Sequence, residues 1–220
     1  SADLDPTASQ ALWIVHIYGF LIAGFLVTMG RLGDRIGPRR LMLLGGAAFA
    51  ALSGLAAFSV NAEMLILVRA LMGIAGATLM PSLFSLLRIM FRDDTQRRLA
   101  IAIMISAFSV GGALGPLLGG VLLEFFWWGS VFLVNVPALV LLLVVGPLLL
   151  PEYREPRGQR LDLPSVALSL GAILSMVYGL QESAEQGMQA GHLAAVVVGL
   201  LLAFVFVRRQ LRIPDPLLDM

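Results

Sequence analysis

Few side chains in this sequence could do chemistry, and they lie within or between long apolar segments. Arg69 and His16 are inside such segments, and Asp34 stands in a short connection among several arginines. A charge in the middle of a membrane costs about 2.5–3.5 kcal/mol on insertion scales, so it usually faces a polar cavity or a partner. An imidazole can also titrate near neutral pH. These residues suit proton transfer, ion pairing and gating, and no catalytic or metal-binding motif accompanies them.

The composition indicates that membrane-spanning helices hold these residues. Of the 220 residues, 59% are hydrophobic and 13% are charged, whereas soluble domains carry roughly 45–50% apolar and about 25% charged residues. There is too little polar surface to cover a soluble body of this size, which excludes a cytosolic enzyme, a secreted domain and a disordered tail. The absence of cysteine excludes disulfides and thiolate-bound metal.

Seven apolar runs are long enough, or nearly so, to cross a bilayer. A crossing helix needs about 20 mostly apolar residues. In lipid each backbone polar group must be satisfied within the segment, so these runs should be helical. None of them alternates apolar and polar residues as a β-barrel strand would. The predicted fold is all-α and polytopic, with spans at Leu12–Met29, Leu41–Ser59, Met64–Ile89, Leu99–Phe126, Ser130–Leu150, Pro164–Leu180 and Leu193–Val207.

The 15 strongly basic residues are all arginines, and their positions predict the orientation. Arginine-rich connections follow the first, third, fifth and seventh spans, whereas acidic residues alone charge the other connections. The positive-inside rule makes the arginine-rich connections cytoplasmic. We therefore expect this sequence to begin outside and end in the cytoplasm, and we expect at least one further helix before residue 1. The cytoplasmic arginines are Arg31, Arg35, Arg39, Arg40, Arg88, Arg92, Arg97, Arg98, Arg154, Arg157, Arg160, Arg208, Arg209 and Arg212.

The first arginine-rich connection reads G-R-L-G-D-R-I-G-P-R-R over residues 30–40. Glycines permit a tight turn, and Asp34 can pair with arginine or cap a helix. An ordinary basic loop is the simpler interpretation. The pattern resembles motif A of the major facilitator superfamily, in which the aspartate helps to lock the inward gate between the two transporter halves, although Pro38 replaces a common basic residue. The resemblance marks as gate residues Gly30, Asp34, Arg35, Gly37, Arg39 and Arg40.

Arg69 is followed by Gly73 and Ala77 at four and eight residues, on the same helix face. Small residues there favour close packing of another helix. The alternative is an arginine that snorkels to the interface, because Arg69 is only about six residues from the outer end of its span. The pattern R-x-x-x-G-x-x-x-A resembles motif B of the superfamily, whose arginine is implicated in proton coupling. This span has no acid near the arginine, so a partner is expected on another helix or in a further segment.

The fourth predicted span contains G-G-A-L-G-P-L-L-G-G over residues 111–120. Small residues recur every four positions from Ala107, a face that lets another helix approach closely, and Pro116 should kink the helix. A packing seam without further function is the alternative. The pattern resembles the antiporter motif C, which implies an exporter rather than a symporter. Its residues are Gly111, Gly115, Pro116, Gly119 and Gly120.

The first span carries Trp13, His16 and Phe20 on one helical face. Trp13 is either an interfacial anchor or a substrate contact, and His16 either binds a neighbouring helix or titrates. The pattern W-I-V-x-I-Y resembles the fourteen-helix drug:proton antiporters, the quaternary-ammonium multidrug exporters. These proteins often carry aspartate at the position of His16. The histidine keeps a protonatable group but removes an anion that would attract cationic drugs.

Residues 128–137 match the pattern W-x-x-x-F-x-x-N-V-P that begins the sixth helix of that family. Asn135 would be costly unpaired in lipid, so a partner is expected; with Trp13, His16 and Phe20 it forms the predicted substrate cavity. When the sequence is aligned with that family, its seven spans correspond to the family's helices two to eight. Residues 1–150 are then a six-helix half without its first helix, 151–161 a cytoplasmic loop, and 162–220 two linker helices and the start of a loop.

The resemblance implies a proton-coupled exporter of lipophilic, above all cationic, drugs in the bacterial inner membrane. We expect no enzymatic activity and no cofactor beyond the proton gradient. Expected partners are the lipid bilayer, a small lipophilic substrate and the remainder of the transporter, without nucleic acid. An exporter of a native lipid or metabolite, and a membrane scaffold that transports nothing, are the alternatives.

Overall fold

The computed structural model describes residue 4 and residues 6–153, 163–187 and 189–211. Most of the loop predicted at 151–161 lies outside these residues, as do Arg154, Arg157, Arg160 and Arg212. The described residues form helices, as predicted: α1 (Ala8–Ile36), α2 (Pro38–Ala57), α3 (Ala62–Gly76), α4 (Leu79–Met90), α5 (Asp94–Phe125), α6 (Ser130–Leu133), α7 (Val136–Leu149), α8 (Leu163–Gln186) and α9 (Ala190–Gln210).

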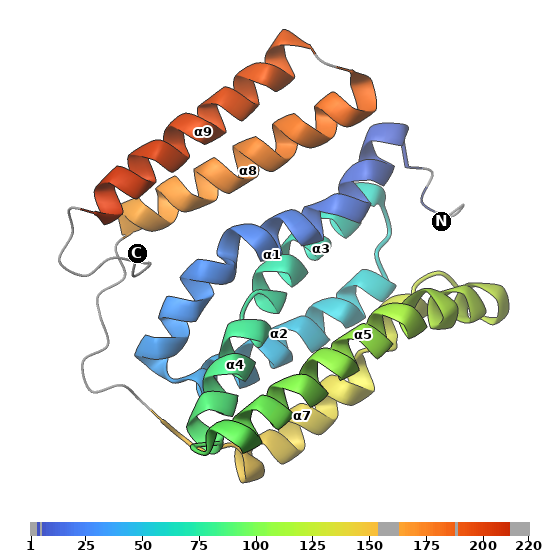
Figure 1. Ribbon diagram of the computed structural model, residues 1–220. Helices are drawn as coiled ribbons and strands as arrows, with labels where there is room; N and C mark the ends of the chain where they lie inside the picture. Colours follow the sequence, from blue (N-terminus) through green and yellow to red (C-terminus); the bar gives the residue numbers. More distant parts are fainter. Residues whose placement is uncertain (1–3, 5, 154–162, 188, 212–220) are drawn as a thin grey trace.

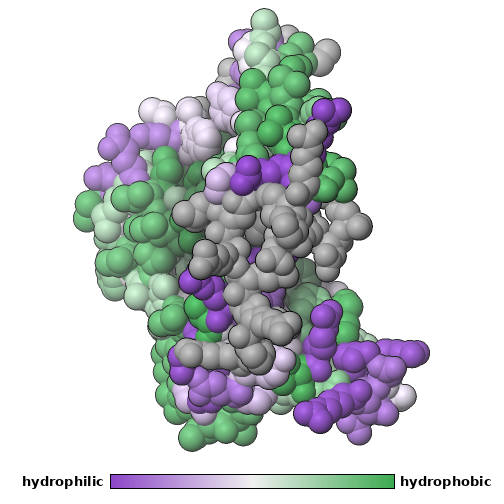
Figure 2. Space-filling view, turned by 90° about the vertical axis from the view of Figure 1, so that its left-hand side faces the viewer, coloured by the Kyte–Doolittle hydropathy of each residue, from purple (hydrophilic) through white to green (hydrophobic). Residues whose placement is uncertain are grey.

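The prediction of an all-α chain of membrane-spanning helices is confirmed. Within the described residues, six helical stretches are long and apolar enough to cross a membrane, and α8 contains a shorter apolar stretch at Pro164–Leu180. Two of the six stretches each contain two helices, because α3 and α4 together form one stretch and α6 and α7 form another. Figure 2 shows broad hydrophobic surfaces on the visible face, with hydrophilic residues gathered in patches.

Prolines account for both interruptions. A proline ring clashes with the carbonyl four residues earlier and cannot donate the helical hydrogen bond. Pro81 stands four residues after Ala77, the residue at which α3 has ended, and Pro137 stands four residues after Leu133, the last residue of α6. At the first break the Thr78 hydroxyl donates to the carbonyl of Ala75 at 2.6 Å. By contrast, Pro116 lies inside the continuous helix α5.

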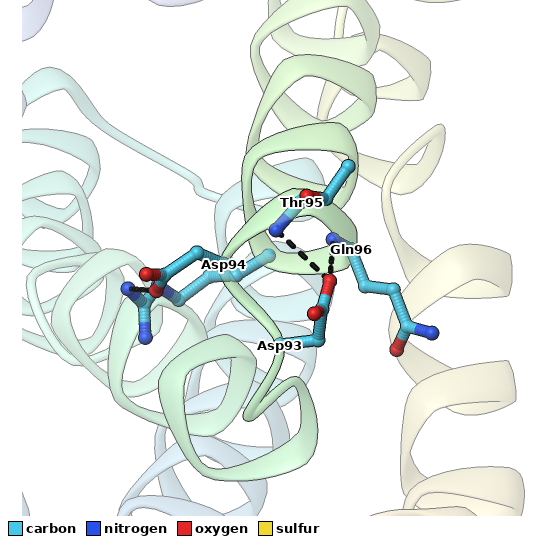
Figure 3. Close-up of polar contacts among 5 residues, drawn as sticks. Asp93, Asp94, Thr95 and Gln96 are labelled. Carbon is cyan, nitrogen blue, oxygen red and sulfur yellow. Dashed lines mark hydrogen bonds and ion pairs between the residues drawn. The ribbon is translucent and has the colours of Figure 1, made fainter.

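Short polar side chains begin several helices by accepting hydrogen bonds from otherwise unpaired backbone N–H groups. Thr7 and the Gln10 side chain form a capping box at α1, and Asn61 accepts from the N–H of Met64 at 2.7 Å at α3. Asp93 accepts from the N–H groups of Thr95 and Gln96 at 3.0 Å each, which starts α5 directly after α4 (Figure 3). Asp94 and Arg97 form an ion pair in the same first turn.

The helices pack around α2 and α3, and α8 and α9 form a separate hairpin along α1 (Figure 1). The buried core lies between α2, α3 and α7, with residues of α1 packed against it. Its centre consists of Phe49, Ala56, Leu65, Val68, Met72, Ala75 and Leu139. The hairpin reaches α1 at Gly24, where a Cβ would lie 3.0 Å from Leu170. In contrast, α5 buries none of its residues and packs mainly against α4 and α6.

Candidate functional site

Arg69 of α3 faces α1 and α6. Its Nη2 donates a hydrogen bond to the carbonyl of Val15 at 3.2 Å, and its Cζ lies 5.5 Å from the centre of the Tyr18 ring and 5.7 Å from that of Phe132. Such cation–π contacts contribute about 0.5–2 kcal/mol each. The Nε–H is buried and has no hydrogen-bond partner among the described residues. Within this part of the chain Arg69 thus contacts a carbonyl and two aromatic rings, and its buried Nε–H is left for a further acceptor.

A close crossing of α1 and α3 sets the position of Tyr18 beside Arg69. A Cβ on Gly73 would lie 2.7 Å from the carbonyl oxygen of Tyr18 and 3.0 Å from the Cβ of Leu21. Only glycine permits this approach, as expected for a small residue on a packing face. Because Gly73 is one turn after Arg69, the crossing that it permits also brings the guanidinium over the Tyr18 ring.

The gate motif is more helical than its glycine content suggests. α1 continues to Ile36, and Gly37 alone separates it from α2. Gly37 has φ 97°, a backbone conformation that glycine adopts at little cost and other residues rarely adopt. Pro38 follows as the first residue of α2, a position where its missing N–H is not needed. Gly30, Asp34 and Arg35 thus lie on the last turns of α1, and Arg39 and Arg40 lie on the first turn of α2.

Asp34 lines a cavity of about 380 Å³ between the ends of α1, α2 and α4. The cavity brings this carboxylate together with two arginines, two hydroxyl-bearing residues and apolar side chains. Such a mixed polar cavity suits a charge-based contact that forms and breaks. The residues around Asp34 are Pro38, Ser85, Arg88, Ile89, Arg92 and Tyr153.

The two arginines at the start of α2 bind the end of α7. Arg39 donates from Nη2 to the carbonyl of Pro147 at 2.6 Å, and Arg40 pairs with Glu152 at 2.5 Å between Nη2 and Oε1. Arg39 also lies 4.0 Å from the same carboxylate. Cations are favourable at the C-terminus of a helix because its last carbonyls have no helical partner. These residues of the gate motif therefore fasten α2 to α7.

The glycine face of α5 has no neighbour in the described part of the chain. A Cβ built on Gly111, Gly115, Gly119 or Gly120 would meet nothing within 4 Å. The predicted close approach of another helix is therefore not seen among these residues, and it stays a prediction. The absence of any buried residue in α5 agrees with an open face.

The residues predicted to form one substrate cavity lie in two separate places. Asn135 lines a largely apolar groove of about 670 Å³ between α1, α2, α4, α5 and α7. Its side chain makes no capping hydrogen bond at the start of α7. Aromatic and sulfur-containing side chains share the groove, including Tyr18, Met42, Phe49, Met80 and Phe108.

Trp13, His16 and Phe20 line a different recess, together with Leu12, Tyr178 and Glu182. The three predicted residues thus share a side of α1, and that side faces α8. Asn135 is not part of this recess, which belongs to α1 and the α8–α9 hairpin.

Several residues at these places were not predicted as site residues. Tyr18 and Phe132 lie within the sequence patterns described above. Their aromatic rings are a signal that a search for cation–π partners of Arg69 could have used. Glu152 is the first acid after the fifth predicted span, and Tyr178 lies near the end of the sixth. Their partners are far away in sequence, so spacing alone does not connect them.

The family model of the Major Facilitator Superfamily matches residues 1–211. The chain belongs to this superfamily. The similarity read from the three motifs is thereby confirmed at the level of the superfamily, whose members are transporters.

Curated relatives within the superfamily are drug and antibiotic exporters. The chain is 51% identical over 217 residues to the multidrug efflux pump LfrA of Mycolicibacterium smegmatis, a match that covers 99% of the chain and 43% of the relative. It is 38% identical over 226 residues to the methyl viologen resistance protein SmvA of Salmonella typhimurium, covering 100% and 45%. A tetracenomycin C resistance and export protein of Streptomyces glaucescens is 34% identical, with 99% and 41% covered. The chain thus spans less than half the length of these relatives.

Proposed function

We propose that this chain is part of a longer proton-coupled exporter of lipophilic, above all cationic, drugs that works by alternating access. The observation that carries the proposal is the 51% identity to a multidrug efflux pump along 99% of the chain. The second relative is named for resistance to methyl viologen, an organic dication. The antiporter-like glycine pattern of α5 supports export rather than uptake.

In this proposal each motif has one task. Asp34 and the basic residues around it lock and release the cytoplasmic gate, and Arg69 and His16 take part in proton coupling. The open glycine face of α5 receives a helix from the remainder of the transporter, against which α5 can rock. Transporters of this kind place substrate near the midplane between two repeats and alternate by rigid-body movement. The partners are then the lipid bilayer, the substrate and the rest of the same protein.

The location follows from the same proposal. The membrane-spanning helices and the bacterial relatives support the bacterial inner membrane. The arginines at the end of α1, the start of α2 and the end of α9 support a cytoplasmic position for those helix ends by the positive-inside rule. In this proposal the start of α1 is on the outer side and the end of α9 is on the inner side.

The test uses the full-length protein that contains this chain, purified in detergent at weak buffering. Ethidium is added, and protons are counted with a pH-sensitive dye. We expect proton release on ethidium binding, because an antiporter binds drug and protons in competition. The control is the same titration with an uncharged metabolite. Drug transport in proteoliposomes that proceeds equally with and without a proton gradient would contradict proton coupling.

An exporter of a native lipid or metabolite is the second candidate. The groove between α1, α2, α4, α5 and α7 favours it, since apolar side chains dominate its lining and would accept an uncharged, lipid-like molecule. His16, where related exporters often carry aspartate, points the same way. Such an exporter would move a fluorescent lipid in proteoliposomes and release no protons when ethidium is added.

A further inference from the structure

Tyr18 faces two different features of the molecule. Its ring packs against the guanidinium of Arg69, with 5.5 Å between Cζ and the ring centre. The same residue lines the largely apolar groove of about 670 Å³ that also contains Asn135. Tyr18 therefore stands between the arginine proposed to take part in proton coupling and the groove in which the predicted cavity residue Asn135 lies.

Contacts with α3 fix where the Tyr18 hydroxyl lies. The backbone of Tyr18 crosses α3 at Gly73, where a Cβ would come within 2.7 Å of its carbonyl oxygen. The hydroxyl lies about one turn further along α3, 3.4 Å from the position of a Cβ on Gly76. Gly76 lines the groove as well. The hydroxyl end of the ring therefore meets the groove at Gly76, while the guanidinium of Arg69 lies over the ring.

The ring of Tyr18 is in contact with other side chains, but its hydroxyl has no partner among the described residues. Arg69 lies over the ring, and Phe49 stands edge-on to it, with 6.2 Å between centroids and 74° between planes. A phenol hydroxyl can donate and accept a hydrogen bond, and leaving such a group unpaired away from water costs free energy. The hydroxyl is thus the part of Tyr18 that is left for a ligand in the groove.

Groups that can donate a hydrogen bond are rare in this groove. Among the described residues that line it, Tyr18 and Asn135 alone carry an O–H or N–H group in the side chain. Small-molecule sites typically combine apolar walls with a few polar groups that fix the orientation of the ligand and provide specificity. In such a lining, one hydroxyl distinguishes a substrate that can pair with it from a substrate that cannot.

The charge of Arg69 decides which partner the hydroxyl prefers. A cation beside a hydroxyl favours donation to an acceptor, because the cation attracts the negative partial charge of the acceptor atom. The same cation repels the positive end of a drug. A cationic drug is therefore expected to lie with a carbonyl or ether oxygen at Tyr18 and with its charge further along the groove.

We infer that Tyr18 is a specificity-determining residue of the groove, whose hydroxyl donates a hydrogen bond to an oxygen acceptor on the substrate. The inference rests on the proposed drug export. It states that, among lipophilic cations, the groove favours those that carry a carbonyl or ether oxygen. Arg69 and Gly73 are positioning residues in this role, because they hold the ring that carries the hydroxyl.

The test measures equilibrium binding of two fluorescent cations to the full-length transporter in nanodiscs by fluorescence anisotropy. Rhodamine 6G carries an ester carbonyl, whereas ethidium contains no oxygen. Tyr18→Phe keeps the ring and removes the hydroxyl. It should weaken rhodamine 6G binding by about two- to tenfold, the range of one hydrogen bond, and leave ethidium binding unchanged. In proteoliposomes the variant should raise KM for rhodamine 6G at unchanged kcat, as loss of a uniform binding contact does.

Ser109→Ala is the matched control, because it also removes a hydroxyl close to the groove. Ser109 follows the groove residue Phe108, and its hydroxyl donates to the carbonyl of Ile105 on its own helix at 3.0 Å. Both cations should bind this variant as they bind the parent. Thermal unfolding of Tyr18→Phe at the temperature of the parent shows that a change in binding does not come from the fold.

The outcomes distinguish the role of Tyr18 from drug export. If the parent transports both cations and Tyr18→Phe binds rhodamine 6G as tightly as Ser109→Ala does, the role of Tyr18 is wrong and drug export stands. Equal weakening of both cations by Tyr18→Phe would also contradict a hydrogen bond to an oxygen acceptor. If the parent neither binds nor transports either cation, drug export and the role of Tyr18 are both wrong.

Discussion

The guanidinium of Arg69 lies over the ring of Tyr18, with 5.5 Å between Cζ and the ring centre. The two residues come from α3 and α1, and Gly73 permits the close crossing that brings them together. The aromatic face partly replaces the carboxylate that a half-buried arginine would otherwise favour. It stabilises the charge without neutralising it, which leaves the buried Nε–H available to an acceptor from elsewhere in the transporter.

Removing the Tyr18 ring should destabilise the protein through Arg69. We expect Tyr18→Leu to lower the free energy of unfolding by about 1–2 kcal/mol beyond lost packing. Tyr18→Phe should cost little, because the ring face remains. A double-mutant cycle with Arg69→Met, followed by thermal unfolding of the full-length protein, measures the coupling. A coupling energy near zero would contradict the cation–π contact.

Two glycines of α2 should respond in opposite directions to the same change. A Cβ at Gly45 would lie 1.7 Å from Oγ1 of Thr78, whereas a Cβ at Gly54 would meet nothing within 4 Å. Gly45→Ala should therefore cost about 1–3 kcal/mol through overpacking. Gly54→Ala should stabilise by about 0.5–1 kcal/mol, because alanine favours the helix. Thermal unfolding of the two variants, measured side by side, checks the sign of each effect.

The pair of Arg40 and Glu152 should contribute modestly and depend on salt. Both side chains are about half exposed, and such pairs contribute about 0.2–1 kcal/mol. Glu152→Gln should lower thermal stability slightly at low salt, and the difference should shrink at 1 M NaCl, where the screening length is about 3 Å. Arg39→Ala should retain a deficit at high salt, because it also removes a hydrogen bond to Pro147.

Reversing the charge at Asp34 should stop transport. Asp34→Lys would place a third cation in a cavity that already contains Arg88 and Arg92, and like charges in one site repel. We expect drug efflux to be lost while the amount of protein in the membrane stays unchanged. Asp94→Lys, in an exposed first turn of α5, is the matched control and should keep efflux. Normal efflux by the Asp34 variant would rule out a role of Asp34 in the gate.

A large residue at Gly115 should affect transport but not this part of the fold. A Cβ there meets nothing within 4 Å. We therefore expect Gly115→Trp to leave both the membrane insertion and the thermal stability of this part of the fold largely unchanged. In the full-length protein it should abolish drug efflux, because another helix is expected to pack on that face. Efflux at the parent rate would rule out the seam.

Much of the fold could be predicted because its determinants are local. Runs such as Leu12–Met29 must form helices, since lipid offers the backbone no other hydrogen-bond partners. The prolines at 81 and 137 likewise act on the carbonyl four residues earlier, although the breaks before them were not predicted. The gate motif was expected to be a loop. It is mostly helical because only Gly37 has a backbone conformation that ends a helix.

The candidate site was less predictable because its contacts join distant parts of the sequence. Trp13, His16 and Phe20 share a helix face by their spacing, so their common recess follows from the period of the helix. Their separation from Asn135 does not follow from spacing, because it depends on which helices stand on either side of α1. The pairs of Trp13 with Tyr178 and of Arg40 with Glu152 likewise link segments more than 100 residues apart.

By itself, the sequence determined that this chain is a bundle of membrane-spanning helices. It also determined where the charges gather and which motifs the chain shares with the superfamily. Each of these properties depends on residue type and short-range spacing. Only the tertiary structure decided what each motif touches. It surrounded Arg69 with rings rather than an acid, left the glycines of α5 open, and joined α8 to the aromatic face of α1. The reason is physical: a helix forms from neighbours in sequence, but its side chains meet whichever helix packs beside them.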